Sequence, residues 1–371
     1  MNASIIKYFS ILKDPRIERH KKHKLVDIIL LAICAVLSGA EGWEAIEEYG
    51  HAKLEWLRKF IPLENGVPTH DTIARVLSRV SAKGLQECFL NWVRAVQQAT
   101  EGQVVAIDGK RVRRSFDWGR RKGAIHMVSA WGSANGLVLG QLKTDAKSNE
   151  ITAIPQLLEL LELKGCIVTL DAMGCQTEIA EKIIEKGADY VLAVKGNQGH
   201  LYEAIVDFFE TAQRAHFRDV PFDYYEETEG GHGRIEVRRY WTTPVLTTLP
   251  HPWAWVGLKI IGMVEAERHL GNKVTVERRY YIASLKSDAR HFGQAVRGHW
   301  GIENSLHWVL DVTLREDECR IRRGEAAENF CTLRHFAFNL LKQEKTLKKS
   351  IKQKRLKAGW DDTYRAKVLF G

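Results

Sequence analysis

Residues 103–108 have the sequence QVVAID, a short β-branched run that closes on the carboxylate of Asp108. Residues 166–171, CIVTLD, repeat this pattern and close on Asp171. Uninterrupted apolar runs of this length are typical of strands buried on both faces, as in a parallel sheet. If the two strands are parallel neighbours, both carboxylates leave the sheet at the same edge. We therefore predict an acidic site at that edge.

The elements around these two runs predict a sheet of mixed direction. Asn135 and Gly136 lie between two strand-like runs, and Asn-Gly in that position is a hairpin signal. Helical segments then alternate with strands, which indicates parallel crossovers. The remaining predicted strands are 126–131, 137–142 and 189–194, and the predicted helices are 150–163 and 177–186. We expect an α/β fold in which an antiparallel hairpin joins parallel α/β units.

The flanking regions differ in composition from this core. Residues 1–100 are predicted to be helical, and two capped segments at 72–80 and 85–99 resemble a helix-turn-helix. That spacing fits a DNA-reading pair and an ordinary helical hairpin equally. Residues 200–285 are rich in aromatic, Val, Thr and Arg residues in their second part, so we predict a β-rich insertion. The basic run in 342–371 indicates a solvated face or a loose tail, and less often a nucleic-acid arm.

Composition narrows the class of protein. The 55 Lys and Arg residues exceed the 46 Asp and Glu residues by nine, which favours a polyanionic partner such as nucleic acid. The six cysteines form no Cys-x-x-Cys motif, so we expect reduced core thiols in a cytoplasmic protein. The longest apolar run, 28–37, is shorter than the roughly 20 residues that span a bilayer. We expect no membrane segment.

Residues 297–311 predict a helix with Glu303 on a mostly apolar face. A half-buried carboxylate is costly unless it is paired or binds a metal. Glu303 is therefore a natural third ligand for a site begun by Asp108 and Asp171, and three acidic oxygens favour Mg²⁺ or Mn²⁺. Two such ions can serve phosphodiester chemistry. The simpler alternatives are turn-forming aspartates and an ion-paired helix glutamate. His299, Glu303 and His307 are also spaced as a helical zinc face would be.

Basic residues follow the first aspartate closely. Their simplest role is solubility, but beside a metal site they favour contacts with phosphates. This group comprises Lys110, Arg111, Arg113, Arg114, Arg120, Arg121 and Lys122. Four tryptophans, 118, 131, 300 and 308, are candidates for stacking on an unpaired base, with core packing as the alternative.

The chain resembles DDE-type insertion-sequence transposases, most closely the H-repeat-associated transposases of enteric bacteria. The resemblance covers nearly the whole chain, and its motifs come in the family's order. These motifs are DPR at 14–16, PTHDTI at 68–73, AIDGK at 106–110, LDAM at 170–173, YVLAVKGNQ at 190–198, HGR at 232–234 and HWGIENSLHWVLD at 299–311.

The resemblance implies a ribonuclease-H-like mixed sheet formed by 101–199 and 286–341, with 200–285 as its β-rich insertion and 1–100 as an all-α domain that binds DNA ends. It implies Asp108, Asp171 and Glu303 as the catalytic, metal-binding triad with two Mg²⁺ or Mn²⁺ ions. It implies binding of the element's terminal inverted repeats as double-stranded DNA, then strand cleavage and transfer. A homodimer on DNA and a nucleoid-associated, cytoplasmic location follow from it.

One departure from the family pattern concerns DNA contacts. Relatives often carry Arg four residues before the glutamate and Lys seven after it, where this chain has His299 and Leu310. Arg297, His299, His307 and Lys195 are candidate substitutes. With Arg234 of the HGR motif and the basic residues 110, 111, 113 and 114, they complete the predicted DNA-binding set.

Two other functions are compatible with the same residues. One is a non-mobile remnant that binds DNA without catalysis. The other is a ribonuclease-H-like nuclease with a cellular role, which would cut without specificity for element ends.

Overall fold

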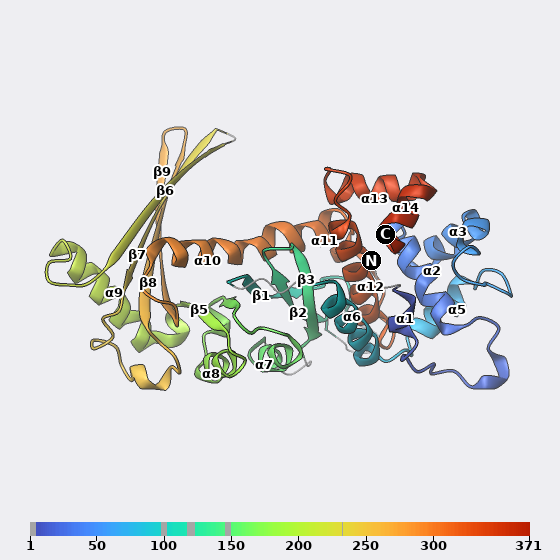
Figure 1. Ribbon diagram of the computed structural model, residues 1–371, viewed down its shortest axis with the longest axis horizontal. Coiled ribbons are helices and arrows are strands. Elements are labelled where there is room, and N and C mark those ends of the chain that lie inside the picture. Colours follow the sequence, from blue (N-terminus) through green and yellow to red (C-terminus); the bar gives the residue numbers. More distant parts are fainter. Residues whose placement is uncertain (1–4, 98–101, 117–122, 145–149, 232) are drawn as a thin grey trace.

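The computed structural model describes residues 5–97, 102–116, 123–144, 150–231 and 233–371. The molecule is elongated, with a helical end that carries both termini, a central sheet, and an arm of long strands that projects beyond the body (Figure 1). A single nine-stranded sheet connects the centre and the arm, in the order β3-β2-β1-β4-β5-β9-β8-β7-β6. The protein is therefore a mixed α/β molecule with a helical N-terminal part.

The central strands follow the predicted order closely. Strands β1, β2 and β3 are antiparallel neighbours, whereas β1, β4 and β5 run parallel. Helices α7 and α8 form the crossovers between the parallel strands. The bounds are β1 (Val104–Arg111), β2 (His126–Gly132), β3 (Leu137–Lys143), α7 (Glu150–Leu160), β4 (Ile167–Leu170), α8 (Thr177–Glu185) and β5 (Asp189–Val194).

The arm is formed by two long hairpins after the helix α9. Strand β9 pairs with β5 near the body, which makes the arm a continuation of the central sheet. The elements are α9 (Gly199–Arg214), β6 (Asp223–Gly231), β7 (Arg234–Thr243), β8 (Ile260–Leu270) and β9 (Lys273–Ala283). A long helix at 199–214 was not expected in this region. The β character predicted for the second half is confirmed.

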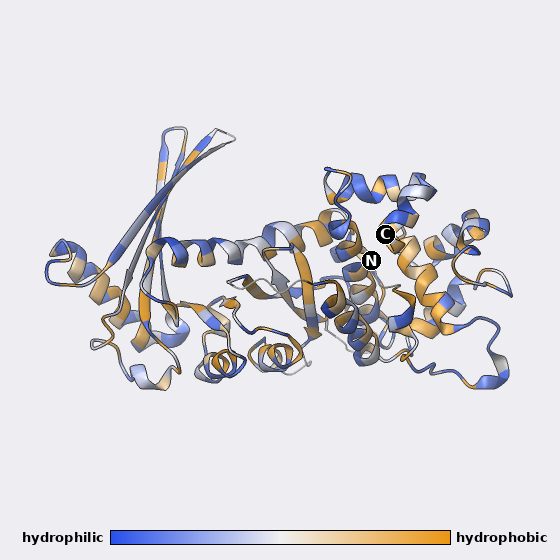
Figure 2. Cartoon of the chain, viewed as in Figure 1, coloured by the Kyte–Doolittle hydropathy of each residue, from blue (hydrophilic) through white to orange (hydrophobic). Residues whose placement is uncertain are grey.

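The helical end combines segments from both ends of the chain. Its N-terminal helices are α1 (Ile6–Phe9), α2 (Leu25–Ser38), α3 (Trp43–Ala52), α4 (Leu54–Leu57), α5 (His70–Leu77) and α6 (Ala82–Val96). Helix α2 is buried along almost its entire length and is largely orange in Figure 2. Helices α3 and α4 are separated at Lys53, where the backbone leaves the helical region.

The C-terminal helices divide between the sheet and this N-terminal part. They are α10 (Ala289–Ile302), α11 (Trp308–Val312), α12 (Ala326–Gln343), α13 (Ile351–Trp360) and α14 (Asp362–Phe370). Helix α10 packs on β1 and the arm, whereas α12 and α13 pack against α2. Of the alternatives for the basic run, a loose tail is wrong for 351–370, because α13 and α14 are helices with buried faces, whereas a solvated face agrees with the exposed residues of α13. The buried Arg355 donates to the carbonyls of Val36 at 3.1 Å and Thr313 at 2.6 Å, and Arg365 lies 4.0 Å from the ring of Trp56.

The cysteines and the most apolar helices show no disulfide and no long apolar span in the described ranges. All six cysteines are free, and five of them are buried. No single helix in the described ranges is long and apolar enough to cross a membrane; α2 and α3 satisfy that test only together, with a bend of 93° between them.

Candidate metal centre and active site

Asp108 and Asp171 lie at matching positions of the neighbouring parallel strands β1 and β4. Ile107 of β1 is in register with Leu170 of β4, and each is followed directly by the aspartate. Asp171 follows the end of β4, but the expected strand end at Asp108 is wrong, because β1 continues to Arg111 and pairs Asp108 with Ser129 of β2. The adjacency of the two aspartates follows from two buried apolar strands that run in the same direction.

Helix α10 brings the third acidic residue to these aspartates by crossing the sheet closely. A Cβ atom on Gly298 would lie 2.9 Å from Cγ1 of Val104, so a larger side chain there would push the helix away from β1. At residue 303 the helix widens into a π turn, Glu303–His307, in which the Trp308 N–H donates to the Glu303 carbonyl. π turns inside α-helices recur at functional sites. The sequence predicted the helix but not this turn.

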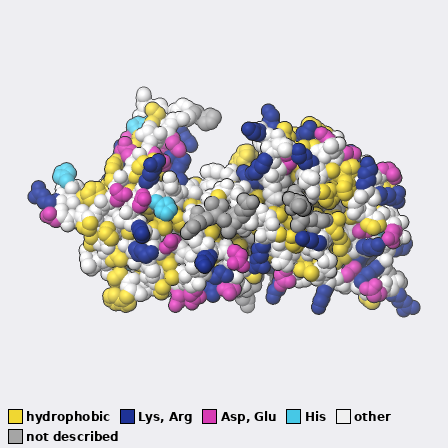
Figure 3. Space-filling model, in the orientation of Figure 1, with side chains coloured by type: hydrophobic (Ala, Val, Ile, Leu, Met, Phe, Trp, Pro, Cys, Tyr) yellow, Lys and Arg dark blue, Asp and Glu magenta, His cyan; other side chains and the backbone are white. Residues whose placement is uncertain are grey.

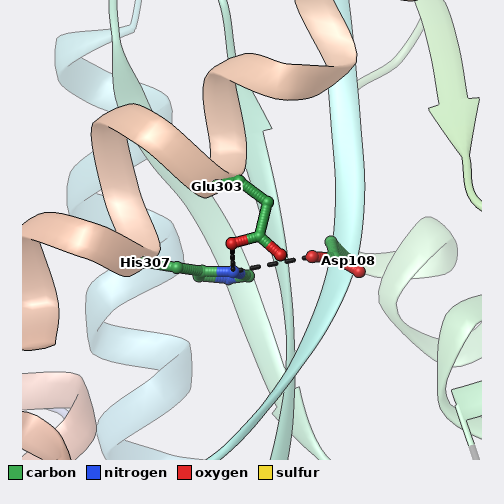
Figure 4. Close-up of side chains that lie close together, drawn as sticks. All are labelled: Asp108, Glu303 and His307. Carbon is green, nitrogen blue, oxygen red and sulfur yellow. Dashed lines mark ion pairs between the residues drawn. The ribbon is translucent and has the colours of Figure 1, made fainter. Parts of the chain in front are cut away.

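Three side chains converge at the π turn (Figure 4). The Nδ1 atom of His307 lies 3.5 Å from Oδ2 of Asp108 and 3.6 Å from Oε2 of Glu303. The potential ligand atoms of the three residues all lie within 4.8 Å of one another. Asp108 and His307 are largely shielded from solvent, whereas the Glu303 side chain is 57% exposed. The cluster is thus closed toward the protein and open on the Glu303 side.

Asp171 stands beside this group but outside it. One of its oxygens, Oδ1, accepts hydrogen bonds from the backbone N–H groups of Met173 at 3.0 Å and Gly174 at 3.3 Å. It therefore caps the short 3₁₀ turn Ala172–Gly174, as the turn-former alternative anticipated. Its second oxygen makes no hydrogen bond within the described chain, and its negative charge acts on Asp108.

The electrostatics of Asp108 indicate an excess of negative charge. Burial raises the pKa of Asp108 to about 7; the imidazole of His307 opposes this shift, while Glu303, Glu150 and Asp171 add to it. His307 in turn holds the pKa of Glu303 below its usual range, against the effect of partial burial. Carboxylates with this imbalance are suited to a divalent cation, which favours their ionised forms.

Gly109 explains how a further acidic residue approaches the cluster. A Cβ atom at this position would lie 2.1 Å from Oε1 of Glu150 and 2.4 Å from Nε2 of His126. Those two side chains form an ion pair of 2.7 Å in the space that the glycine leaves open. Sequence patterns gave no sign of this pair, because it depends on the packing of α7 against β2.

Lys110, predicted to contact DNA, is buried in a second acidic cluster. Its Nζ lies 2.6 Å from Asp311, 2.8 Å from Glu316 and 3.4 Å from Asp317, and its side chain is only 10% exposed. Burial alone would lower the pKa of Lys110, but the carboxylates of Glu316 and Asp311 more than reverse this and raise it. This placement argues against a DNA contact. His307 is buried as well, so it is not available to a surface duplex in this conformation.

The other predicted DNA-binding residues lie at separate positions. Arg111 and Arg114 are exposed and have no carboxylate partner in the described ranges, and Lys195 is exposed at the end of β5. Arg113 pairs with Asp317 at 3.2 Å, and Arg297 pairs with Glu229 of the arm at 2.7 Å. Arg234 is exposed near the tip of the arm and is 3.9 Å from Glu236. Residues 118, 120, 121, 122 and 232 lie outside the described residues.

The positions of His299 and of three tryptophans bear on two of the open alternatives. Nδ1 of His299 is 3.0 Å from the Thr169 hydroxyl on β4, and burial lowers the pKa of this imidazole. His299 is therefore not part of the three-residue cluster, which weakens the zinc-face alternative. Trp131 is in the core, whereas Trp300 and Trp308 are 41% and 59% exposed. The guanidinium of Arg279 stacks 4.5 Å from the ring of Trp300.

A basic loop that the sequence did not single out adjoins the exposed arginines after β1. Arg320, Arg322 and Arg323 line a hollow of about 540 Å³ that also borders Trp43 and Ala74 of the helical end. Arg322 donates to the Arg114 carbonyl at 3.0 Å, which ties the loop to the segment after Asp108. Elsewhere basic and acidic side chains are interleaved on the visible face (Figure 3). The contact between Arg322 and Arg114 spans 208 residues of the chain, so sequence patterns could not place the loop beside the segment after Asp108.

Comparison with known proteins assigns the chain to a protein family. The family described as "Transposase DDE domain" matches residues 99–340, and "DDE_Tnp_1-associated" matches residues 6–93. The chain belongs to the DDE transposase family. It is 46% identical to "Putative transposase YncI" of Escherichia coli O157:H7, over 99% of this chain and 94% of that protein. It is also 46% identical to "H repeat-associated putative transposase YhhI" of Escherichia coli (strain K12), over 99% and 98% of the two chains.

The family match supports the assignment of this chain as a DNA transposase. A cryo-EM structure of the piggyBac transposase synaptic complex with hairpin DNA also aligns with it. That alignment has a TM-score of 0.44 and 13% identity, over 99% of this chain and 79% of that one. The transposase domain of residues 99–340 contains Asp108, Asp171, Glu303 and His307, so the whole acidic group lies within it.

Proposed function

We propose that the protein binds the terminal inverted repeats of an insertion element as double-stranded DNA and catalyses metal-dependent strand cleavage and strand transfer. The observation that carries this proposal is the convergence of Asp108, Glu303 and the neighbouring Asp171 beside the parallel strands β1 and β4, within a domain of the DDE transposase family. Because Glu303 is exposed, a DNA backbone can approach the cluster from solvent.

The central strands support a ribonuclease-H-like core. Three antiparallel strands, β1 to β3, are followed by β4 and β5 parallel to β1, and the acidic helix α10 packs across them. In this proposal 101–199 and 286–341 form the catalytic core, and 200–285 is an insertion placed before the last acidic helix. Residues 1–100 would bind the DNA ends, and two copies would act together on paired ends at the nucleoid.

Asp108, Asp171 and Glu303 would hold the metal in this proposal. Their donors are oxygens, which Mg²⁺ and Mn²⁺ prefer, and the burial and neighbouring carboxylates that raise the pKa of Asp108 support the proposal of a bound cation. Two divalent ions bound there supply activation of a water or 3′-hydroxyl and stabilisation of the leaving oxygen. The chain itself positions the ligands: β1 fixes Asp108, the 3₁₀ turn fixes Asp171, and the π turn fixes Glu303.

Phosphate contacts would come from the cations that the protein leaves without an acidic partner. Within the described ranges, Arg111, Arg114, Arg320 and Arg323 are exposed and form no ion pair. Lys195 lies at the carboxyl end of β5, on the same sheet. Neutralisation of phosphates by such residues supplies most of the affinity of DNA-binding proteins. Arg113, Arg234, Arg297 and His299 remain in the proposed set, but each already has a partner in the protein.

A nicking assay on a duplex that carries the element's end tests this function. We expect Asp108→Asn, Asp171→Asn and Glu303→Gln to reduce Mg²⁺-dependent nicking by at least about 10³-fold, because each removes a ligand charge. DNA binding should be retained in all three. Glu318→Gln, an exposed carboxylate near the second cluster, is the matched control and should cleave normally.

The outcome separates the alternatives. Normal cleavage by any one of the three variants would remove that residue from the triad. End binding by the unmodified protein without cleavage would favour a non-mobile remnant. Cleavage of unrelated duplexes or RNA–DNA hybrids as readily as element ends would favour a cellular nuclease.

A further inference from the structure

His307 was expected as a DNA-binding candidate and, with His299 and Glu303, as one residue of a helical zinc face, but not as a partner of Asp108. As a DNA-binding candidate it would need to reach the surface, yet it is 4% exposed and faces two carboxylates (Figure 4). We propose that His307 is a ligand of the metal ion at this site, through Nδ1, together with Asp108 and Glu303. This inference rests on the proposed function, because it concerns the same metal site.

The distances suit ligands of one ion better than they suit hydrogen bonds. Nδ1 of His307 is 3.5 Å from Asp108 and 3.6 Å from Glu303, longer than the roughly 3.2 Å limit of a good hydrogen bond. Around an octahedral ion with bonds of about 2.1 Å, adjacent donors lie about 3 Å apart and opposite donors about 4.2 Å apart. Both measured distances fall in this interval. One ion can therefore satisfy all three groups with small side-chain adjustments.

The surroundings of the ring leave it few other partners. Its Nε2 atom is buried and makes no hydrogen bond to any residue in the described part of the chain. The orientation of the imidazole is consequently set by the helix and by the two carboxylates that face Nδ1. A buried, polar nitrogen that is directed at two carboxylates is an unusual arrangement unless a cation can join them.

The π turn explains how the ring reaches this position. A turn closed by an i to i+5 hydrogen bond contains more residues than an α turn. Ile302, Leu306 and Leu310 are spaced four apart, and all three remain buried through the wider turn. The first and last residues of the turn, Glu303 and His307, thereby face Asp108 together. The distortion of the helix coincides with the two residues that the inference assigns to the ion.

Pulsed EPR on the full chain with Mn²⁺ in place of Mg²⁺ tests this directly. A directly bound imidazole nitrogen gives a ¹⁴N hyperfine coupling to Mn²⁺, which carboxylate ligands cannot give. We expect this coupling in the unmodified protein and its replacement by a ¹⁵N coupling after selective ¹⁵N-histidine labelling. His307→Gln should abolish the coupling and weaken Mn²⁺ binding by at least about tenfold.

His299→Gln is the matched control, because His299 lies on the same helix and is also shielded, but bonds to Thr169. The coupling should persist in this variant and disappear in Asp108→Asn. Bound Mn²⁺ without a ¹⁴N coupling in the unmodified protein would overturn the inference and leave an all-carboxylate site. If His307→Gln fails to fold, the unmodified, labelled and His299→Gln proteins still decide between a nitrogen ligand and an all-carboxylate site.

The metal-ligand role of His307 and the proposed transposition chemistry are contradicted by different results. A nitrogen-coupled Mn²⁺ site in a protein that does not nick element ends would support the ligand and sink the transposition chemistry. Normal Mg²⁺-dependent nicking with no nitrogen coupling would sink only the role of His307.

Discussion

Two acidic clusters lie side by side along β1 and the helix that crosses it. They differ in how much positive charge the protein supplies to balance their carboxylates. Asp108 of β1 meets Glu303 and His307 of the π turn, while Lys110, two residues further along β1, meets Asp311 of α11 and Glu316. The second cluster contains its own cation. The first has only an imidazole to set against its carboxylates.

The ionisation of the two clusters expresses this difference. Burial raises the pKa of Asp108 to about 7, so the folded protein resists the charged form. Burial would act likewise on Glu316, but Lys110 and Arg334 reverse the effect and lower its pKa to about 2. Burial of acidic residues is therefore not by itself a sign of function. The informative feature is a buried carboxylate for which the protein supplies too little positive charge.

The largest effect should come from breaking the self-neutralised cluster. Lys110→Met leaves Asp311, Glu316 and Asp317 without their shared cation, so we expect a loss of about 3–5 kcal/mol in the free energy of unfolding. Urea denaturation measures it. Arg113→Met is the control, because Arg113 binds the same Asp317 from an exposed position and should cost less than about 1 kcal/mol. Equal losses in the two variants would mean that the cluster is not a closed unit.

Mutation of the metal cluster should stabilise the fold when no metal is present, whereas mutation of the second cluster destabilises it. The pKa of Asp108 is about 7 in the folded chain against an ordinary value of 3.8, so the folded state holds the proton more tightly. Metal-free protein should therefore lose stability as the pH rises from about 4 to about 7. Asp108→Asn removes this penalty, and we expect it to be about 2 kcal/mol more stable than the unmodified protein at pH 8.

Urea unfolding in EDTA at about pH 8 and about pH 4.5 measures this gap, which should nearly close at the lower pH. Glu316→Gln supplies the contrast, since the lowered pKa of Glu316 stabilises the fold at every pH above its unfolded value. That variant should be less stable than the unmodified protein at both pH values. A destabilising Asp108→Asn at the higher pH would show that the first cluster is already compensated within the protein.

The sequence predicted two members of the first cluster, Asp108 and Glu303, and did not predict the second cluster, for a physical reason. Asp108 and Asp171 follow buried apolar runs, whose strand character can be inferred from the local pattern, although β1 continues beyond Asp108 to Arg111. Glu303 was located from the helical spacing around it. Glu316, a partner of Lys110, lies 206 residues away in the chain, so the burial of this lysine depends on tertiary packing alone.

Several local features of the helices and strands could not be predicted from the sequence either. The π turn replaces one hydrogen-bond pattern by another within an unbroken helix, and His307 keeps the same i+4 spacing from Glu303 in both. Strand β6 was missed because most of its side chains are exposed and polar, which removes the alternation that marks a half-buried strand. The burial of 351–370 was not predicted, because the arginines of this segment suggested an exposed surface. In the structure their guanidinium groups donate to buried backbone carbonyls.

The smallest expected effect concerns DNA binding by two arginines beside the clusters, of which one has an acidic partner in the described ranges and the other has none. Arg111 is exposed without an acidic partner in the described ranges, whereas Arg113 pairs with Asp317 of the closed cluster. If the duplex lies beside these clusters, Arg111→Ala should weaken end binding several-fold and lower the slope of log affinity against log salt by about one. Arg113→Ala should change that slope by less, because its charge is partly neutralised in the free protein. Equal slopes in the two variants would mean that the closed cluster opens to release Arg113 when DNA binds.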